Sequence, residues 1–243
     1  LRQAGEQPTY RFLDARERAP LAAHPDLSRR DGQVQRELSL NGALAAAIPG
    51  LPAALVVLAE RYGKLPLRDS LAPASRPARD GVGRDRNYPE RAEWRLPALL
   101  ADAESSRIFL EQGRIPAEFG LLRQADLVRT LERLARDGHA GFYGGETAQK
   151  MVTAVRAAGG IWSARDLAKY RVVERQPLRY PLADGRELIS APPPSAGGVA
   201  LAQSLVMLQQ LPWRKAGEIQ RSHYVVEVLR RAYRDRGQLG DPD

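Results

Sequence analysis

Apolar residues recur along much of the chain at the three- and four-residue spacing that places them on one face of a helix. The clearest case is residues 124–137, where Leu127, Leu131 and Leu134 share a face and Gly138 follows the last turn. The same periodicity predicts further helices over residues 51–62, 69–79, 146–158, 164–170, 199–210 and 218–238. Helix is therefore the dominant element expected, with Ser163 as the N-cap of the segment 164–170.

Few segments alternate in the way that a half-buried strand requires. Residues 9–16 and 186–191 are the two predicted strands. On a strand over 9–16, Asp14 and Arg16 would point to the same side. Residues 81–93 are dense in charge, glycine and proline, which predicts solvated surface. Since helices outnumber strands without regular alternation, the pattern predicts a mixed α and β chain.

One uncharged stretch, residues 38–59, is long enough to cross a bilayer on paper. Pro49, Gly50 and Pro52 interrupt it, because proline lacks the N–H that continues a helix. The stretch therefore predicts two short buried segments around a turn, and no membrane span.

The composition is that of a folded globular chain. Of 243 residues, 43% are hydrophobic and 27% are charged, which excludes a disordered chain and is enough material for one large domain. The net charge of +8 comes from 37 basic and 29 acidic residues. Because these are interspersed and aromatic residues make up only 6%, mixed-sign surfaces are favoured over a nucleic-acid-binding face. A basic nucleic-acid-binding or scaffold module stays open as an alternative.

The sequence lacks the residues that several classes of catalytic and metal-binding site require. There is no cysteine, which excludes disulfides, thiolate nucleophiles and cysteine-bound zinc. His24, His139 and His223 are far apart and have no metal-ligand spacing around them. There is no Gly-x-Ser-x-Gly motif for a nucleophilic serine. We therefore expect no catalytic nucleophile, metal site or cofactor site in this chain.

Two short motifs have both a structural and a functional interpretation. Residues 14–17 (DARE) place Arg16 at the end of a strand, where its guanidinium could bind a substrate carboxylate with two hydrogen bonds. The residues alone favour an ordinary exposed pair with a neighbouring carboxylate. Residues 191–198 (APPPSAGG) favour a rigid strand-to-helix corner capped by Ser195, with backbone N–H groups at the helix start as an anion site in the alternative.

A set of motifs, in order, resembles the large subunit of the gamma-glutamyltransferases, also called gamma-glutamyl transpeptidases or glutathione hydrolases, within the N-terminal-nucleophile hydrolases. The resemblance covers the chain from about Thr9 to its last residue. The motifs are residues 14–20 (DARERAP), 48–50 (IPG), 62–66 (YGKLP), 73–74 with 78–81 (PA, ARDG), 141–145 (GFYGG), 159–160 with 166–170 (GG, DLAKY), 192–198 (PPPSAGG) and 235–243 (DRGQLGDPD).

The resemblance implies a mixed α/β (α+β) fold, the four-layer αββα sandwich, which a small subunit outside this chain completes. It implies that Arg16 binds the α-carboxylate of the γ-glutamyl group. The family's nucleophile is a threonine that becomes the N-terminus of the small subunit after self-cleavage. Residues 1–243 are then expected to be one domain of a large subunit, incomplete at both ends and inactive alone.

The implied activity is transfer of a γ-glutamyl group to water, amino acids or peptides, with glutathione as a donor and without a cofactor. The implied partner is the small subunit of the same precursor, with no nucleic acid, and the implied location is periplasmic or secreted, in a bacterium. Ala196 and the charged segment 81–95 depart from the family pattern. They leave open an acylase for glutaryl or cephalosporin-like amides, or a poly-γ-glutamate enzyme.

Overall fold

The computed structural model describes residues 1–4, 8–183 and 185–240. The chain divides into two compact units, one formed by Ala15–Val172 and the other by Leu1–Asp14 together with Val173–Asp243. We call the first the helical unit and the second the terminal unit, and describe each by itself. The expectation of a single domain stays a prediction.

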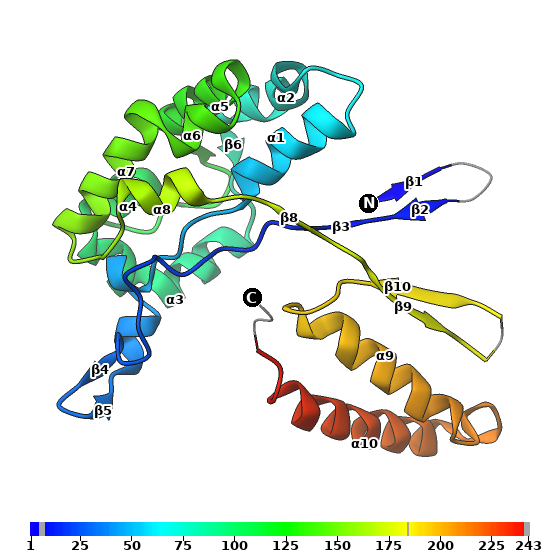
Figure 1. Cartoon of the computed structure of the whole chain (residues 1–243). Coiled ribbons are helices and arrows are strands. Elements are labelled where there is room, and N and C mark those ends of the chain that lie inside the picture. The colour runs from blue at the N-terminus through cyan, green and yellow to red at the C-terminus, as the bar shows by residue number, and fades with distance from the viewer. Residues whose placement is uncertain (5–7, 184, 241–243) are drawn as a thin grey trace. The chain divides into compact units, whose positions relative to one another are not determined.

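Helices make up most of the helical unit (Figure 1). Its α-helices are α1 (Leu51–Arg61), α2 (Leu67–Asp80), α3 (Asn87–Ala101), α4 (Ala103–Phe109), α5 (Ala125–Asp137), α6 (His139–Tyr143), α7 (Gly145–Ala157) and α8 (Ala164–Lys169). Two 3₁₀ turns, η1 (Arg36–Ser39) and η2 (Ala43–Ala45), precede α1. The short strands form two antiparallel pairs, β4 (Arg29–Arg30) with β5 (Gln33–Val34) and β6 (Val82–Gly83) with β7 (Leu121–Leu122).

The core of the helical unit consists of two clusters of buried side chains. The larger cluster joins Ile48, Ala53, Tyr143, Ala148, Val152, Trp162, Leu167 and Tyr170. The smaller joins Val56 of α1, Leu71 of α2 and Leu134 of α5. Because α1 contributes Ala53 to one cluster and Val56 to the other, this helix connects the two halves of the core.

The predicted helix over residues 124–137 is present as α5, but its buried face differs from the predicted leucine stripe. Val128 and Leu134 are buried, whereas Leu127 is 40% exposed. Val128, Leu131 and Leu134 are three residues apart, so a helix places them on one face, and Leu127 lies at its edge. Helical periodicity thus identified the element and two of its core-facing leucines, Leu131 and Leu134.

The prediction of a solvated surface holds for most of residues 81–93, and Arg84 and Ala92 are the buried exceptions. The segment holds β6 and the first half of α3. Arg84 is buried, and its guanidinium donates to Glu111 Oε1 at 2.8 Å and to the Leu121 carbonyl at 3.1 Å. The Asp85 carboxylate accepts the backbone N–H groups of Asn87 and Tyr88, both at 3.1 Å, which starts α3. Arg84 is therefore used inside the fold, whereas the other charged residues of the segment are exposed: Asp85, Arg86, Glu90, Arg91 and Glu93.

The terminal unit has short antiparallel strand pairs and two long helices. The pairs are β1 (Arg2–Gln3) with β2 (Thr9–Tyr10), β3 (Phe12–Asp14) with β8 (Val173–Arg175), and β9 (Leu178–Pro181) with β10 (Glu187–Ser190). Helices α9 (Ala196–Gln209) and α10 (Glu218–Arg236) flank the 3₁₀ turn η3 (Trp213–Lys215) and pack side by side (Figure 1). Val228 and Ala232, which are four residues apart and so share a face of the helix, are the buried residues of α10.

Three features bear on the sequence predictions. The predicted strand over residues 9–16 is broken at Arg11 and ends at Asp14, so it does not reach Arg16. No helix in the described part of the chain is long and apolar enough to cross a membrane. Residues 241–243, which close the last motif, lie outside the described residues.

Candidate functional site

The Arg16 side chain lies at the surface of the helical unit, in an irregular segment that follows directly after β3. Its side chain is 52% exposed, and its Nη2 lies 3.8 Å from Oε1 of Glu17, which is 61% exposed. An ion pair this long and this exposed contributes little to stability. The Glu17 carboxylate therefore holds the Arg16 guanidinium only weakly.

The backbone around Arg16 is held more firmly than its side chain. The Arg16 carbonyl accepts a hydrogen bond of 2.7 Å from the Tyr170 hydroxyl. Arg18 and Ile48 exchange two backbone hydrogen bonds, of 3.0 and 2.8 Å. The Leu21 N–H donates to Asp166 Oδ1 at 2.6 Å. The exposed guanidinium thus extends from a segment that is tied to the core at three points.

Gly50 allows two of these segments to approach each other. A Cβ at this position would lie 2.0 Å from the Tyr170 hydroxyl oxygen and 2.1 Å from the Ala15 carbonyl oxygen. The adjacent Pro49 carbonyl accepts a hydrogen bond of 2.7 Å from the Tyr143 hydroxyl. The Pro-Gly turn is therefore where the Arg16 segment meets the aromatic core, and only glycine fits there.

Three stacked aromatic rings pack next to the Pro49-Gly50 turn. His139 stacks on Tyr143 with 4.4 Å between ring centroids, and Tyr143 stacks on Tyr170 at 5.3 Å. The Nε2–H of His139 donates to the Tyr170 carbonyl at 3.0 Å. Burial lowers the pKa of His139 and raises the pKa of the Tyr143 phenol. The His139 imidazole is consequently uncharged at neutral pH, and the Tyr143 hydroxyl stays a hydrogen-bond donor.

Asp166 connects the start of α8 to the end of the Arg16 segment. Its carboxylate accepts hydrogen bonds of 2.6 Å from the N–H and from the hydroxyl of Ser163, and a third from the Leu21 N–H. The Asp166 N–H donates back to the Ser163 hydroxyl, which completes a capping box. Burial alone would raise the pKa of Asp166, but the hydrogen bonds from Ser163 and Leu21 outweigh it and lower the pKa. Asp166 is therefore ionised while it holds both segments.

Asp14 does not share a strand face with Arg16, contrary to the sequence prediction. It is the last residue of β3 and is buried, and its carboxylate accepts a hydrogen bond of 2.9 Å from Nε of Arg175 on the paired strand β8. The chain leaves the strand conformation before Arg16, so the alternation of sides does not extend to it. Asp14 belongs to the packing of the terminal unit.

The proline-rich corner before α9 is a close approach between backbone segments. A Cβ at Gly198 would lie 2.1 Å from the Ala191 carbonyl oxygen, so glycine lets the first turn of α9 pack on the strand exit. Ser195 is the N-cap residue, but its side chain makes no capping hydrogen bond, so the predicted side-chain cap is wrong. The corner is therefore a structural join between strand and helix that requires glycine at position 198.

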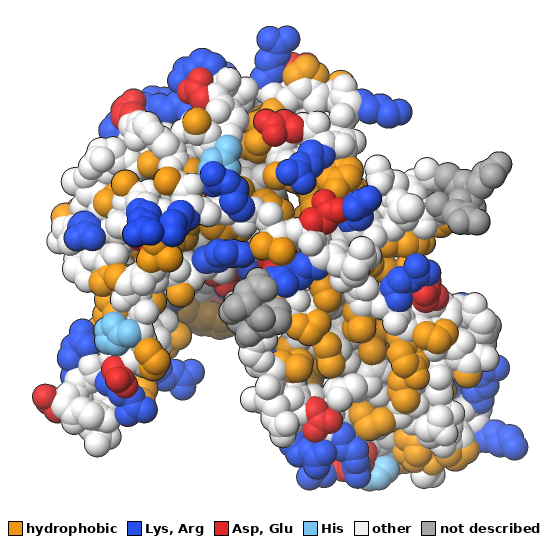
Figure 2. Space-filling view, viewed as in Figure 1, with side chains coloured by type: hydrophobic (Ala, Val, Ile, Leu, Met, Phe, Trp, Pro, Cys, Tyr) orange, Lys and Arg blue, Asp and Glu red, His pale blue; other side chains and the backbone are white. Residues whose placement is uncertain are grey.

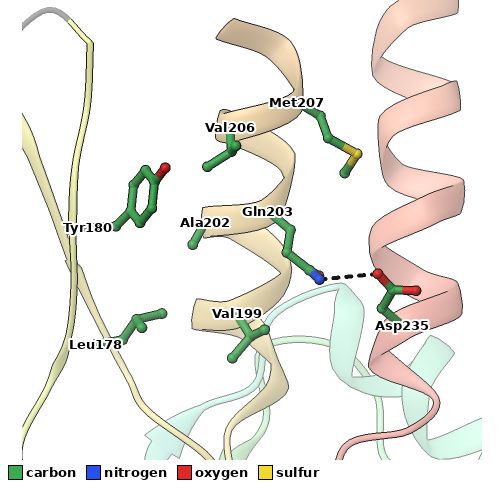
Figure 3. Close-up of a pocket in the computed structure, with 8 residues that line it drawn as sticks. All are labelled: Leu178, Tyr180, Val199, Ala202, Gln203, Val206, Met207 and Asp235. Atoms are coloured by element: carbon green, nitrogen blue, oxygen red, sulfur yellow. Dashed lines mark hydrogen bonds between the residues drawn. The ribbon is translucent and has the colours of Figure 1, made fainter. Parts of the chain in front are cut away.

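The terminal unit also has an apolar groove of about 400 Å³ between β9, α9 and α10 (Figure 3). Its lining residues are Leu178, Tyr180, Val199, Ala202, Gln203, Val206, Met207 and Asp235. Asp235, the first residue of the last sequence motif, accepts a hydrogen bond of 3.2 Å from Gln203 and so joins α10 to α9. None of the lining residues is cationic, so the groove lacks the group that a carboxylate substrate requires.

The surface charges form no single basic patch on the face shown in Figure 2, where Lys and Arg side chains are interspersed with acidic and apolar ones. Within residues 1–4, 8–183 and 185–240, no three His, Asp or Glu side chains gather in a way that could hold a metal ion.

Comparison of the sequence and structure of the chain with known proteins identifies its family. The family model described as gamma-glutamyltranspeptidase matches residues 1–243. A glutathione hydrolase proenzyme from Pseudomonas sp. (strain A14) is 35% identical over 237 residues, which are 96% of this chain and 41% of that protein. The crystal structure of Helicobacter pylori gamma-glutamyltranspeptidase superimposes with a TM-score of 0.89 at 32% identity, over 94% of this chain and 67% of that one. A cephalosporin acylase from Bacillus halodurans has a TM-score of 0.81 at 28% identity, over 92% of this chain and 42% of that one.

These similarities define the fold class as that of the N-terminal-nucleophile hydrolases, with mixed helix and strand, as predicted. The chain belongs to the gamma-glutamyltranspeptidase family. It spans about 41% of the length of the Pseudomonas relative. The family prediction is confirmed, and the role of Arg16 stays a prediction.

The sequence motifs contained the supporting residues without showing what they do. Gly50, Tyr143, Asp166 and Tyr170 all fall within quoted motifs, yet no role followed from their spacing. Tyr170 is 154 positions from Arg16, and Asp166 is 145 positions from Leu21. The available signal was that three separate motifs carry a glycine, an aromatic residue or a carboxylate. Such residues indicate shared packing only once their contacts are known.

Proposed function

We propose that the complete protein cleaves γ-glutamyl amides, with glutathione as a donor, and transfers the γ-glutamyl group to water, an amino acid or a peptide. The reaction runs through a γ-glutamyl ester on the threonine of a second subunit. In this proposal the present chain supplies Arg16, which binds the α-carboxylate of the donor. Membership of the gamma-glutamyltranspeptidase family supports the reaction class.

The observation that carries the proposal is a half-exposed guanidinium on a backbone tied at three points. The planar N–H groups of arginine match the two oxygens of a carboxylate. A carboxylate fixed at one end of the γ-glutamyl group fixes the position of the γ-carbonyl at the other end. Such orientation can supply several kcal/mol of rate enhancement.

The nucleophile in this proposal lies outside the chain. The chain's own threonines are internal residues, and Thr130 and Thr147 lie within helices α5 and α7. The attacking threonine hydroxyl would pass its proton to its own terminal amine, which returns it to the leaving amine as the ester forms. The Pseudomonas relative is a proenzyme, which supports a precursor that is cleaved into subunits. Family membership likewise supports a periplasmic or secreted location.

The test is steady-state hydrolysis of a γ-glutamyl anilide by the full-length processed protein and its Arg16→Ala variant. Losing a hydrogen-bonded charge pair with the donor should raise donor KM roughly tenfold to a hundredfold. Arg18→Ala is the matched control, since it removes a neighbouring arginine side chain and keeps the backbone pair with Ile48. An unchanged KM in Arg16→Ala would contradict the assignment.

A related acylase is the second candidate, because the Bacillus halodurans structure that resembles this chain is a cephalosporin acylase. A glutaryl donor differs from a γ-glutamyl donor only by the missing α-amino group, and both retain the carboxylate. Comparing kcat/KM for the two anilides separates the candidates. Faster turnover of the γ-glutamyl donor is expected, and faster turnover of the glutaryl donor would favour the acylase.

The nucleic-acid alternative has its own test. A nucleic-acid-binding module would bind duplex or single strands with an affinity that falls steeply as salt rises. The interspersed charges of Figure 2 lead us to expect no such binding at low salt.

A further inference from the structure

Tyr170 places a hydroxyl on the carbonyl of Arg16. The ring is buried in the larger core cluster, with 2% of the residue exposed. Its hydroxyl donates to the Arg16 carbonyl oxygen at 2.7 Å. The carbonyl carbon is bonded to the Arg16 Cα, so any movement of this carbonyl also moves the base of the Arg16 side chain.

Tyr170 is itself fixed from several sides. Its ring stacks on Tyr143 with an interplanar angle of 9°. Its own carbonyl accepts hydrogen bonds from His139 Nε2 at 3.0 Å and from Arg171 Nη1 at 2.7 Å. The absent side chain of Gly50 leaves the space through which the hydroxyl reaches Arg16. The Tyr170 hydroxyl is therefore a rigid donor to the backbone carbonyl of a surface arginine.

We propose that Tyr170 is a positioning residue for the donor-binding arginine: its hydroxyl holds the Arg16 backbone where the guanidinium meets the donor carboxylate. This inference rests on the proposed function, in which Arg16 binds that carboxylate. Tyr170 touches no substrate and acts through Arg16. Removing the hydroxyl leaves the ring, the stack and the core in place and frees the Arg16 carbonyl.

The variant Tyr170→Phe isolates this hydrogen bond. In the full-length processed protein with a γ-glutamyl anilide, donor KM should rise about threefold to tenfold, the effect of losing one neutral hydrogen bond. The kcat should stay within about twofold, since the lost interaction serves donor binding. Tyr88→Phe is the matched control, because Tyr88 also donates to a carbonyl, that of Phe109, at 2.7 Å in the same unit. It should change neither constant.

The double variant Arg16→Ala with Tyr170→Phe tests whether the tyrosine acts through the arginine. Its donor KM should equal that of Arg16→Ala alone, because the hydroxyl then has no guanidinium to position. The inference would be overturned if the rise in donor KM of the double variant equalled the product of the rises in the two single variants. A Tyr170→Phe variant with lower thermal stability but an unchanged donor KM would also overturn it, provided that Arg16→Ala raises donor KM. An unchanged KM in Arg16→Ala is a separate outcome, which overturns the proposed role of Arg16 itself.

Discussion

Gly50 shows how one missing side chain determines the geometry around Arg16. Its φ of −109° is accessible to any residue, so the requirement for glycine is steric. A Cβ would meet the Tyr170 hydroxyl on one side and the Ala15 backbone on the other. Because backbone cannot move aside as a flexible side chain can, the turn and the Arg16 segment would have to separate.

We therefore expect Gly50→Ala to lower the free energy of unfolding by about 1–3 kcal/mol, the usual effect of overpacking. Urea unfolding of the variant measures this change. Gly83→Ala is the control in the same unit, because a Cβ at Gly83 meets no atom within 4 Å. If both variants lost the same free energy of unfolding, the close approach at Gly50 would not be the cause of the loss.

His139 gives the helical unit a pH dependence with a defined sign. Burial lowers its pKa below the ordinary value of 6.5, against the opposing effects of its bond to the Tyr170 carbonyl and of Glu60. The unfolded chain then binds a proton more readily than the folded chain does. Stability is complete above pH 6.5 and falls as the pH drops through 6.5 towards the folded pKa. His139→Gln should remove that part of the pH dependence between pH 7 and 5, and identical profiles for the two proteins would refute the assignment.

Among the elements, α8 combines a capped helix start with a tie to the Arg16 segment. Asp166 is ionised in the fold because Ser163 and Leu21 donate to its carboxylate, which lowers its pKa below the ordinary 3.8. A carboxyl of this kind stabilises the fold above its unfolded pKa and loses that effect as the pH falls through the folded pKa.

Asp166→Asn should lower the free energy of unfolding at pH 7 by about 1–3 kcal/mol, since a charged acceptor is lost from buried hydrogen bonds. The difference from wild type should shrink as the pH falls below 3.8, where the unfolded wild-type chain takes up a proton at Asp166, towards the lower pKa of the folded state. Ser163→Ala is the comparison, because it removes the cap and keeps the tie to Leu21, and should cost about 1 kcal/mol. A difference between Asp166→Asn and wild type that does not change with pH would contradict this account.

The elements also show where sequence patterns succeed and where they fail. Local periodicity was enough for α5 and α10, because each buries residues on one face at helical spacing. Charge density predicted the exposure of most of residues 81–93 but not the burial of Arg84, whose charge is matched by Glu111 and by the Leu121 carbonyl, which are distant in sequence. The same limit applies to the site. Arg16 was found from a local motif, whereas its support by Tyr170 depends on a contact that no spacing encodes.

At the scale of the whole molecule, the helical unit contains the three ties that hold the Arg16 segment. The donors and acceptors of these ties all lie within Ala15–Val172. The proposed anchor therefore depends on the folding of that unit. The chemistry depends on the remaining polypeptide, since the chain spans about 41% of the Pseudomonas relative.

The central claim is that Arg16 binds the α-carboxylate of a γ-glutamyl donor, and one comparison tests it most directly. It measures kcat/KM of the full-length processed protein and of Arg16→Ala for a γ-glutamyl anilide and for a 4-aminobutyryl anilide, which lacks only that carboxylate. Arg16→Ala should reduce kcat/KM for the γ-glutamyl donor roughly tenfold to a hundredfold and leave the 4-aminobutyryl donor unchanged. Equal losses for both donors, or no loss for the γ-glutamyl donor, would contradict the claim.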